Sequence, residues 1–277
     1  MKREEIRLTE HATHNTQYVP LAGKSLVIIG GTTGLGLSAA RAFVASGANV
    51  TVVGRNTGSV KAAAGELGKA AFGFAADAVR PQTPVRAIHH ALERFGRFDG
   101  LYHVAGGSGR RMGDGPLHKL TDKGLRATLD LNLTSLIFSN RAAVQQFLAQ
   151  RSGGTILNMS SVLAFSPSPR FFATHAYAAA KSAVIGFTKS IASYYAAKNI
   201  RCNVLAPGLV NTQMAKRAST DRAIQKFMQR KQPLDGGRIG MPSDLDAAAV
   251  YFMSDASKFV TGQVLAVDGG WCLTGAT

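Results

Sequence analysis

Short apolar runs alternate with helix-like stretches along almost the whole chain from Gly23 onward. The runs are nearly continuous in apolar residues, which is typical of parallel strands buried on both faces of a sheet. Parallel neighbours need long crossover connections, and the stretches between the runs supply them. The pattern predicts an α/β fold, a doubly wound domain around a parallel sheet of about seven strands. The expected strands are residues 25–29, 49–53, 71–75, 100–104, 155–159, 201–205 and 263–267.

The domain organisation follows from where this alternation begins and ends. Residues 1–22 are polar and irregular, so we expect them to form an N-terminal extension. Residues 23–277 contain no repeat and no Pro- or Ser-rich linker, so we expect one domain there. In such a sheet ligands bind beyond the carboxyl ends of the strands, which directs attention to the residues just after each run. The expected helices include residues 35–46, 84–95, 122–150 and 176–198.

The charge balance leaves three classes of partner open. The 277 residues include 32 Lys and Arg against 16 Asp and Glu, a formal net charge of +16. Nucleic acid, a membrane surface and anionic small molecules all match such an excess. The basic residues are dispersed without interleaved aromatics, so we expect no nucleic acid. No segment has about 18 uninterrupted apolar residues and no signal-peptide core is present, so we expect a cytoplasmic protein without a membrane partner.

Residue spacing gives no support to metal or disulfide chemistry. Cys202 and Cys272 are the two cysteines of the chain, and they form no CxxC pair. His89 and His90 are adjacent, so on a helix their side chains would point about 100° apart. None of the seven histidines has an HExxH spacing. We therefore expect reduced thiols and no bound metal.

A glycine-rich turn joins the first expected strand to the first expected helix. Glycines let a backbone turn sharply and approach a pyrophosphate, whose charge is met by N–H groups at the helix N-terminus. The order of strand, glycines and helix is typical of a Rossmann-type nucleotide-binding domain. The spacing here is GxxxGxG rather than GxGxxG. The residues expected to contact the cofactor are Gly30, Thr32, Thr33, Gly34, Leu35 and Gly36.

The residues after the second expected strand bear on the choice of cofactor. An acidic side chain there would hydrogen-bond the ribose hydroxyls of NAD and repel a 2′-phosphate. Gly54 occupies that place and Arg55-Asn56 follow, which favours NADP(H) over NAD(H). A solvated loop arginine is the alternative interpretation of Arg55. Asp77, after the third run, is a candidate acceptor for the adenine amino group or, equally, a helix N-cap.

Tyr177 and Lys181 are the candidate catalytic pair. They lie four residues apart on an expected helix and therefore share one face. A neighbouring ammonium favours the phenolate and lowers the tyrosine pKa from its usual value of about 10, as general acid–base catalysis requires. Ser161 follows the strand at 155–159 and adds a hydroxyl at a strand end. A single Tyr-x-x-x-Lys match is most often accidental, so the pair gains weight only with other motifs.

Several further motifs occur in a fixed order between residues 23 and 270. They are GGTTGLG, LDLNL around Asn132, NMSS ending at Ser161, YAAAK from Tyr177, NVLAPGLVNT and VTGQVLAVDGG. Together they resemble the classical type of the short-chain dehydrogenase/reductase family, with the 3-oxoacyl reductases as the sharper comparison. The chain departs from that family at 103–106, where His-Val-Ala-Gly replaces Asn-Asn-Ala-Gly, and at Ile29, where Thr is usual. The loop from Ser161 to Tyr177 is also about three residues longer than in the ketoacyl reductases, a feature expected to reshape the substrate mouth.

The resemblance implies a catalytic tetrad. Tyr177 would be the general acid–base, and Lys181 would lower its pKa and bind the nicotinamide ribose. Ser161 would polarise the carbonyl oxygen, and Asn132 would anchor a water-linked proton relay. The helices at 122–150 and 176–198 would form the contacts of a homotetramer or dimer. The further cofactor contacts implied are Tyr177, Lys181, Ala105, Gly106, Pro207, Gly208 and Thr212.

The presumed lid, residues 211–238, carries seven Lys or Arg against two Asp. Arg110 and Arg111 add two more positive charges in a second loop expected near the pocket. An anionic small-molecule substrate, such as a carboxylate, a phosphate or an acyl-carrier thioester, is one interpretation, and a solvated basic helix face is the other. The apolar lid residues expected to cap the pocket are Met214, Ile224, Phe227 and Met228.

These observations lead to two competing hypotheses about function. The first is an NADP(H)-dependent oxidoreductase that transfers a hydride between nicotinamide and a carbonyl or secondary alcohol, with a 3-oxoacyl thioester as the sharper substrate. The second is a non-catalytic cofactor-sensing or nucleic-acid-binding protein that keeps the fold. The presence of Asn132, Ser161, Tyr177 and Lys181 together favours the first.

Overall fold

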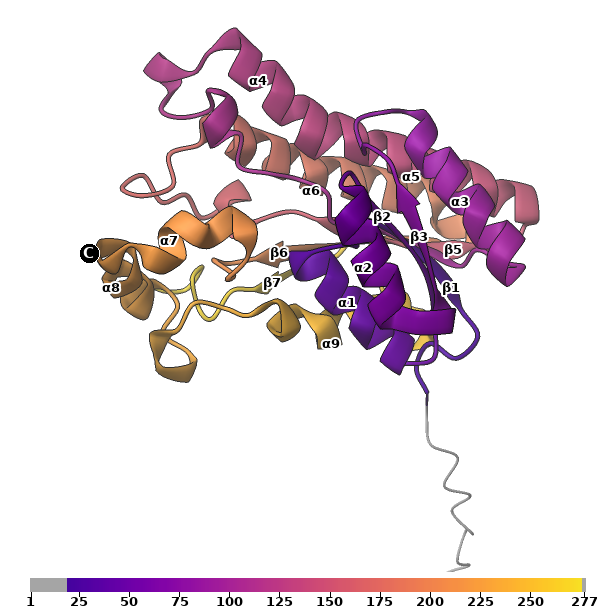
Figure 1. The fold of residues 1–277 in the computed structure, drawn as a ribbon. Helices are drawn as coiled ribbons and strands as arrows, with labels where there is room; N and C mark the ends of the chain where they lie inside the picture. Colours follow the sequence, from indigo (N-terminus) through magenta and orange to yellow (C-terminus); the bar gives the residue numbers. More distant parts are fainter. Residues whose placement is uncertain (1–18, 276–277) are drawn as a thin grey trace, which may run out of the picture.

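A seven-stranded parallel sheet runs through the centre of the structure, a computed structural model that describes residues 19–275 (Figure 1). The strand order is β3-β2-β1-β4-β5-β6-β7, so the order reverses between β1 and β4. The predicted fold class is confirmed, whereas most of the predicted extension, residues 1–18, lies outside the described residues. The strands are β1 Ser25–Ile29, β2 Asn49–Gly54, β3 Ala71–Ala75, β4 Gly100–His103, β5 Gly154–Met159, β6 Ile200–Pro207 and β7 Val264–Val267.

Helices cover both faces of the sheet (Figure 1). One face packs against α1 (Gly34–Ala45), α2 (Thr57–Leu67) and α9 (Asp246–Met253). The other packs against α3 (Gln82–Phe95), α5 (Ser135–Gln150) and α6 (His175–Tyr195). Within residues 19–275, no helix has the length and apolar character needed to cross a membrane.

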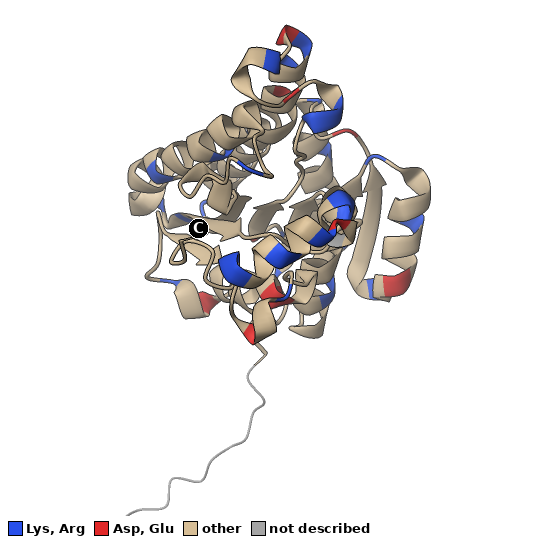
Figure 2. Cartoon of the chain, turned by 90° about the vertical axis from the view of Figure 1, so that its left-hand side faces the viewer, with Lys and Arg blue, Asp and Glu red and all other residues tan. Residues whose placement is uncertain are grey.

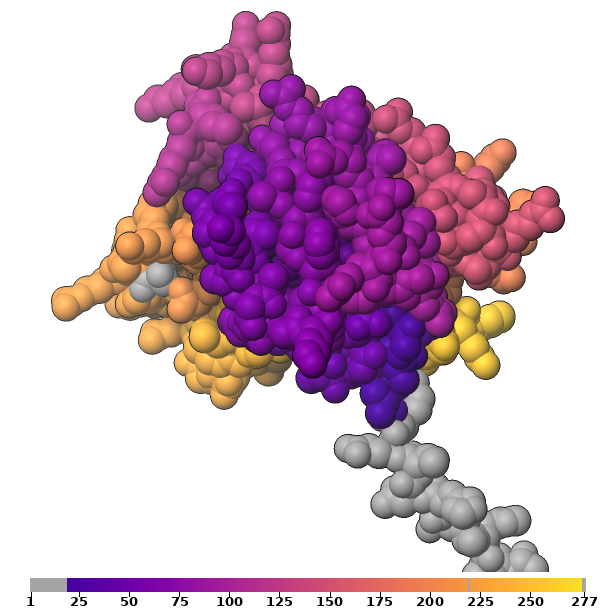
Figure 3. Space-filling model, turned by 45° about the vertical axis from the view of Figure 1, so that its right-hand side comes forward, coloured from indigo at the N-terminus to yellow at the C-terminus, as the bar shows by residue number. Residues whose placement is uncertain are grey.

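The lid lies beyond the sheet, at the end where β6 and β7 point (Figure 1). It contains the short helix α7 (Lys216–Thr220) and the longer helix α8 (Arg222–Lys231). In Figure 3 the orange lid and the magenta segment around α4 (Asp122–Leu129) project from the same side of the molecule. The lid therefore stands beside the carboxyl ends of the strands, where the site was expected.

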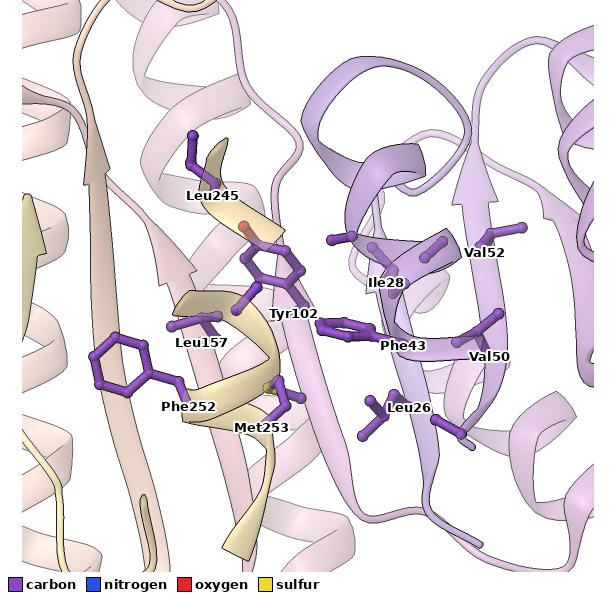
Figure 4. Packing of buried hydrophobic residues seen from close by; sticks show 14 of the residues in the cluster. Leu26, Ile28, Phe43, Val50, Val52, Tyr102, Leu157, Leu245, Phe252 and Met253 are labelled. Atoms are coloured by element: carbon purple, nitrogen blue, oxygen red, sulfur yellow. The ribbon is translucent and has the colours of Figure 1, made fainter. Parts of the chain in front are cut away.

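Two apolar clusters, one on each face of the sheet, hold these layers together. On the first face Phe43 of α1 is fully buried and its ring centroid lies 6.0 Å from that of Tyr102 on β4 (Figure 4). On the second face Phe98 stacks on Phe147 of α5, with ring centroids 4.8 Å apart. Burial of whole aromatic side chains is a major source of stability in such a domain.

The predicted helix at 122–150 is not continuous. After α4 the chain makes a π-helical turn over Asp130–Thr134 and then enters α5. Asn132 lies in this turn and is fully buried. The hydroxyl of Ser135 donates to the carbonyl of Leu131 at 2.7 Å, which satisfies a backbone acceptor where the helical pattern changes. Turns of this kind are frequent at functional sites.

Truncating Phe43 to alanine is expected to lower the free energy of unfolding by about 3–5 kcal/mol, because it leaves a cavity between α1 and the sheet. The matched control is Phe259→Ala, which removes the same side chain from a fully exposed position and is expected to change stability by less than about 0.5 kcal/mol. Urea unfolding of both variants measures the difference. Equal losses in the two variants would contradict the packing described here.

Candidate active site

The glycine-rich turn at residues 30–36 follows β1 at the point where the strand order reverses. Gly30 has a φ of 90°, and a Cβ on it would lie 2.7 Å from the Ala105 nitrogen. A Cβ on Gly36 would overlap the carbonyl oxygen of Gly30. Only glycine therefore permits this close passage of β1, α1 and the segment after β4. The amides of Gly30 and Gly31 donate to the Val53 carbonyl, so the amides that can face a phosphate are those at the start of α1.

A cavity of about 370 Å³ lies over this turn. Gly54 is the last residue of β2, and a Cβ on it would overlap the hydroxyl oxygen of Thr32. The position at which an acidic side chain would face the ribose is therefore filled by Thr32. The fit to a dinucleotide is good, because backbone amides, hydroxyls and Arg55 are the only polar groups needed for its phosphates. The predicted cofactor residues that line this cavity are Gly30, Thr32, Thr33, Gly34, Leu35, Arg55, Asn56, Asp77, Ala105, Gly106 and Thr212.

Two of these residues also have local structural roles. Asn56 caps α2, and its side-chain oxygen accepts from the Ser59 amide at 2.9 Å. Asp77 accepts from the Val79 amide at 3.3 Å. It is not the N-cap of α3, because α3 begins five residues further on, at Gln82. The N-cap interpretation of Asp77 is therefore wrong, and its contact with the adenine amino group stays a prediction.

A second cavity, of about 350 Å³, adjoins the first and contains Ser161, Tyr177 and Lys181 in its wall. Helix α6 presents Tyr177 and Lys181 on one face, with the Lys181 ammonium 5.6 Å from the centroid of the Tyr177 ring. The Ser161 hydroxyl lies near enough to the Tyr177 hydroxyl to act on its pKa. Pro207 and Gly208, at the end of β6, line the same cavity. Leu35, Gly106 and Thr212 border both cavities, so a ligand can extend from one into the other.

Burial governs the protonation of this pair. It raises the pKa of Tyr177 to about 12, against the smaller opposing effect of the Ser161 hydroxyl. It also lowers the pKa of Lys181 to about 8. The Tyr177 pKa therefore moves opposite to the direction expected from a neighbouring ammonium. The reason is that burial dominates. The Lys181 ammonium does not offset it, because it donates to the Met159 carbonyl at 2.8 Å instead of to the phenol.

Asn132 lies behind the cavities. Its side-chain nitrogen donates to the carbonyls of Gly107, at 2.8 Å, and Thr128, at 2.9 Å. Its oxygen accepts from the Gly107 amide at 3.0 Å. A Cβ on Gly106 would lie 2.8 Å from this oxygen and 3.3 Å from the Lys181 nitrogen, so both side chains flank Gly106. The π-helical turn thus brings Asn132 close to Lys181 without a direct bond between them.

Asp114 belongs to the site and was not predicted from the sequence. Its carboxylate accepts from the backbone amides of Ala176, at 3.1 Å, and Tyr177, at 2.8 Å. It therefore satisfies free N–H groups at the start of α6 and fixes the backbone that carries Tyr177. The contact joins residues more than 60 positions apart, so no local motif reveals it.

His103, which stands where the family has Asn, is fully buried beneath the site. Its ring nitrogens face the hydroxyls of Ser139, at 3.0 Å, and Ser135, at 3.4 Å. Burial, and after it the charge of Lys181, lowers the pKa of His103 to about 3. His103 is therefore neutral near pH 7, and through Ser135 it supports the π-helical turn.

The basic and apolar residues of the lid separate into distinct groups. Arg217 joins Arg110, Arg111 and Lys216 at the second cavity. Arg238 instead pairs with Asp235 and Asp244. Met214 lines both cavities, as expected of a cap. The prediction fails for Ile224 and Met228, which are buried in a cluster with Trp271, and for Phe227, which lines a separate groove.

Comparison with known proteins agrees with this geometry. A family model described as Enoyl-(Acyl carrier protein) reductase matches residues 30–272. The 3-oxoacyl-(acyl-carrier-protein) reductase FabG of Chlamydia trachomatis is 34% identical over 254 residues, which cover 90% of this chain and 98% of that protein. The 2,5-dichloro-2,5-cyclohexadiene-1,4-diol dehydrogenase of Sphingobium indicum is 32% identical, with coverages of 91% and 98%. A short-chain type dehydrogenase/reductase from Mycobacterium ulcerans has a TM-score of 0.84 and 30% identity, and the match covers 92% of each chain.

The chain therefore belongs to the short-chain dehydrogenase/reductase family, and the resemblance inferred from its motifs is confirmed. Members of this family are oxidoreductases that act on carbonyl or alcohol groups with a nicotinamide cofactor. The two adjoining cavities match this division between cofactor and substrate.

Replacing His103 with asparagine is expected to reduce the acid sensitivity of folding. The folded-state pKa of about 3 lies below the unfolded value of 6.5, so the unfolded chain binds an extra proton between these limits. The stability due to a neutral His103 is complete above pH 6.5 and is lost as the pH falls, by about 1.4 kcal/mol per unit. Between pH 7 and pH 5 the wild type should lose about 2 kcal/mol more than His103→Asn.

Urea unfolding at the two pH values measures this difference. His118→Asn, which removes an exposed histidine, is the matched control and should keep the wild-type dependence. If the free energy of unfolding changes with pH equally in the wild type and in His103→Asn, His103 contributes nothing to the acid sensitivity.

Proposed function

We propose that this protein is an NADP(H)-dependent reductase of carbonyl compounds in which Tyr177 is the general acid–base. The observation that carries the proposal is the convergence of Ser161, Tyr177 and Lys181 on the wall of one cavity that adjoins the glycine-turn cavity. A hydroxyl donor, a phenol and an ammonium at one place are the groups that carbonyl reduction requires. This arrangement gives little support to a non-catalytic role.

The proposed roles follow from the protonation of the pair. When bound, the nicotinamide supplies the hydride that adds to the carbonyl carbon, or removes it in the reverse direction. The Ser161 hydroxyl orients the carbonyl oxygen, and Tyr177 donates its phenolic proton to that oxygen. A pKa raised to about 12 keeps Tyr177 protonated at neutral pH, as a proton donor must be. Lys181, whose pKa is lowered to about 8, is charged below that pH and stabilises the phenolate that remains.

Asn132 and Asp114 do not contact the substrate in this proposal. They fix the backbone segments that hold Lys181 and Tyr177 in place. Asn132 holds both polar groups of Gly107 and thereby fixes the strand end beside the ammonium. Asp114 fixes the first turn of α6. Both are positioning residues, since the polar atoms of their side chains are already engaged with the protein.

The preference for NADP(H) rests on the end of β2. Thr32 fills the space in which an acidic side chain would stand, and Arg55 borders the cavity directly after it. A guanidinium binds a 2′-phosphate through charge-assisted hydrogen bonds and has no comparable partner in NAD(H).

For the substrate we propose an anionic carbonyl compound, with a 3-oxoacyl thioester as the sharper assignment. Arg110, Arg111, Lys216 and Arg217 border the substrate cavity, and they come from two separate segments, which a basic face on one helix does not explain. The relative from Chlamydia trachomatis is named as a 3-oxoacyl-(acyl-carrier-protein) reductase. We further propose a homotetramer or dimer formed through the helices α4 to α6.

Tyr177→Phe is expected to lower kcat for NADPH-dependent reduction by a factor of about 10² to 10⁴, because it removes the proton donor. The dissociation constant of NADPH should stay within about twofold, since the ring remains. Absorbance at 340 nm with an acetoacetyl thioester measures the rate, and fluorescence titration measures binding. Tyr194→Phe removes a hydroxyl from an exposed tyrosine and is the control. A fully active Tyr177→Phe enzyme would refute the mechanism.

Arg55→Ala is expected to weaken NADPH binding by about 10- to 100-fold, the usual loss of a hydrogen bond to a charged group. NADH binding should be nearly unchanged, because NADH lacks the 2′-phosphate. Fluorescence titration of both cofactors measures the two constants, with Lys69→Ala, at an exposed position between α2 and β3, as the control. Tighter binding of NADH than NADPH by the wild type would contradict the assignment.

A further inference from the structure

A basic groove lies outside the substrate cavity, between residues 167–171 and helix α8. Its volume is about 460 Å³. Arg170 stands on one wall, and Lys226, Arg230 and Lys231 stand on the other. Among the described residues that line the groove, none is acidic. Figure 2 views the molecule from this side, where Lys and Arg predominate on α7 and α8.

An aromatic partition separates the groove from the substrate cavity. Phe171 and Phe227 line the groove, whereas Phe172 and Trp271 line the cavity. The rings pack edge to face, with centroids 5.2 Å apart for Phe171 and Phe227 and 5.6 Å apart for Phe172 and Trp271. The partition is completed by Phe227 and Trp271, whose centroids are 6.2 Å apart. Rings that line the groove therefore pack directly on rings that line the substrate cavity.

The positive border of the substrate cavity meets the groove at Phe171. The guanidinium groups of Arg110 and Arg217 donate to the Phe171 carbonyl at 3.4 Å and 3.0 Å. Arg110 and Arg217 border the cavity, and the ring of Phe171 forms part of the groove. The backbone of Phe171 therefore links the basic border of the substrate cavity to the groove.

Two of the groove cations, Arg170 and Lys226, have no carboxylate partner among the described residues. Arg170 lies over the Phe171 ring at 5.1 Å. Lys231 donates to the Thr274 carbonyl at 2.5 Å and is near enough to Asp268 to lower the pKa of that carboxyl. Like charges on facing walls repel, and a multiply charged anion between them removes that repulsion.

We propose that this groove binds the phosphate groups of a small-molecule thioester, while its acyl group occupies the substrate cavity. The inference rests on the proposed function and names the carrier part of the substrate. Several cations on two walls match a phosphate ester better than a single carboxylate, and arginine binds phosphate in a fork. The partly exposed rings of Phe171 and Phe227, together with the Arg170 guanidinium over Phe171, add a surface on which a nucleobase can stack. The occupant with both features is a coenzyme-A-type arm.

The longer loop between Ser161 and Tyr177 builds one wall of this groove. Pro167 and Pro169 restrict its backbone, and the Ser166 carbonyl accepts from the Trp271 indole at 3.1 Å. The prolines and this hydrogen bond therefore restrict the segment that holds Arg170 opposite α8. The loop that we expect to reshape the mouth of the substrate cavity therefore also forms one wall of the separate basic groove.

Two thioesters that differ only in the carrier test the proposal. Acetoacetyl-coenzyme A carries the phosphates, and acetoacetyl-N-acetylcysteamine presents the same carbonyl without them. In the variant Arg170→Glu/Lys226→Glu, KM for the coenzyme A ester should rise at least tenfold, whereas KM and kcat for the short ester stay within about twofold. The matched control Lys61→Glu/Lys69→Glu, on exposed positions around α2, should affect neither substrate.

Equal effects on both thioesters, or no effect on either, would overturn the proposal. If only an acyl-carrier-protein thioester is sensitive to the variant, the groove binds a protein partner and the proposal is likewise wrong. Failure of the wild type to reduce any carbonyl compound would count against the proposed function instead, and a binding measurement then decides the inference on its own.

That measurement uses adenosine 3′,5′-bisphosphate as the probe, with the cofactor cavity saturated by NADP⁺. Trp271 is the only tryptophan of the chain and lies in the partition, so its fluorescence reports binding. We expect saturable binding by the wild type that is at least tenfold weaker in Arg170→Glu/Lys226→Glu and unchanged in the Lys61→Glu/Lys69→Glu control. Absence of binding, or equal binding by both variants, would overturn the proposal whatever the outcome with thioesters.

Discussion

The buried ammonium of Lys181 at the carboxyl end of β5 constrains the charge and size of the side chains around it. The Lys181 side chain is 2% exposed, and within the described part of the chain its ammonium forms no ion pair with a carboxylate but donates to the Met159 carbonyl. Desolvation of such a group is costly, so its pKa falls and its neighbours must tolerate the residual charge. His103 remains neutral beneath it, and Gly106 offers no side chain beside it. An anionic partner that enters the adjoining cavity relieves this cost.

The position of Lys181 depends in turn on how α6 is held. The Ser160 hydroxyl donates to the Lys181 carbonyl at 2.7 Å, and Asp114 binds the amides of the first turn. The chemically important side chains thus stand on a helix that is fixed from β5 and from the loop after β4. Sites built on such rigid supports keep the sub-ångström precision that proton transfer needs.

Much of the fold was predictable because its physical cause is local. Strands buried on both faces leave continuous apolar runs, and β1 and β3 begin and end where these runs do. The glycine turn and the residues Tyr177 and Lys181 were recognisable for the same reason. The π-helical turn around Asn132 was not, since residues 130–134 contain no proline or glycine that would mark a change of helix type. Asp114 and the direction of the Tyr177 pKa depend on burial and on distant contacts, which spacing does not contain.

The aromatic partition has a thermodynamic consequence. Phe171 and Phe172 are joined by one peptide bond, and their rings border opposite hollows. A ligand that changes the position of one ring therefore acts on the wall of the other hollow. Such linkage is reciprocal: if an occupied groove tightens acyl binding by some factor, an occupied cavity tightens binding in the groove by the same factor. The binding free energy of a substrate that fills both hollows would then exceed the sum of the free energies with which its two parts bind separately.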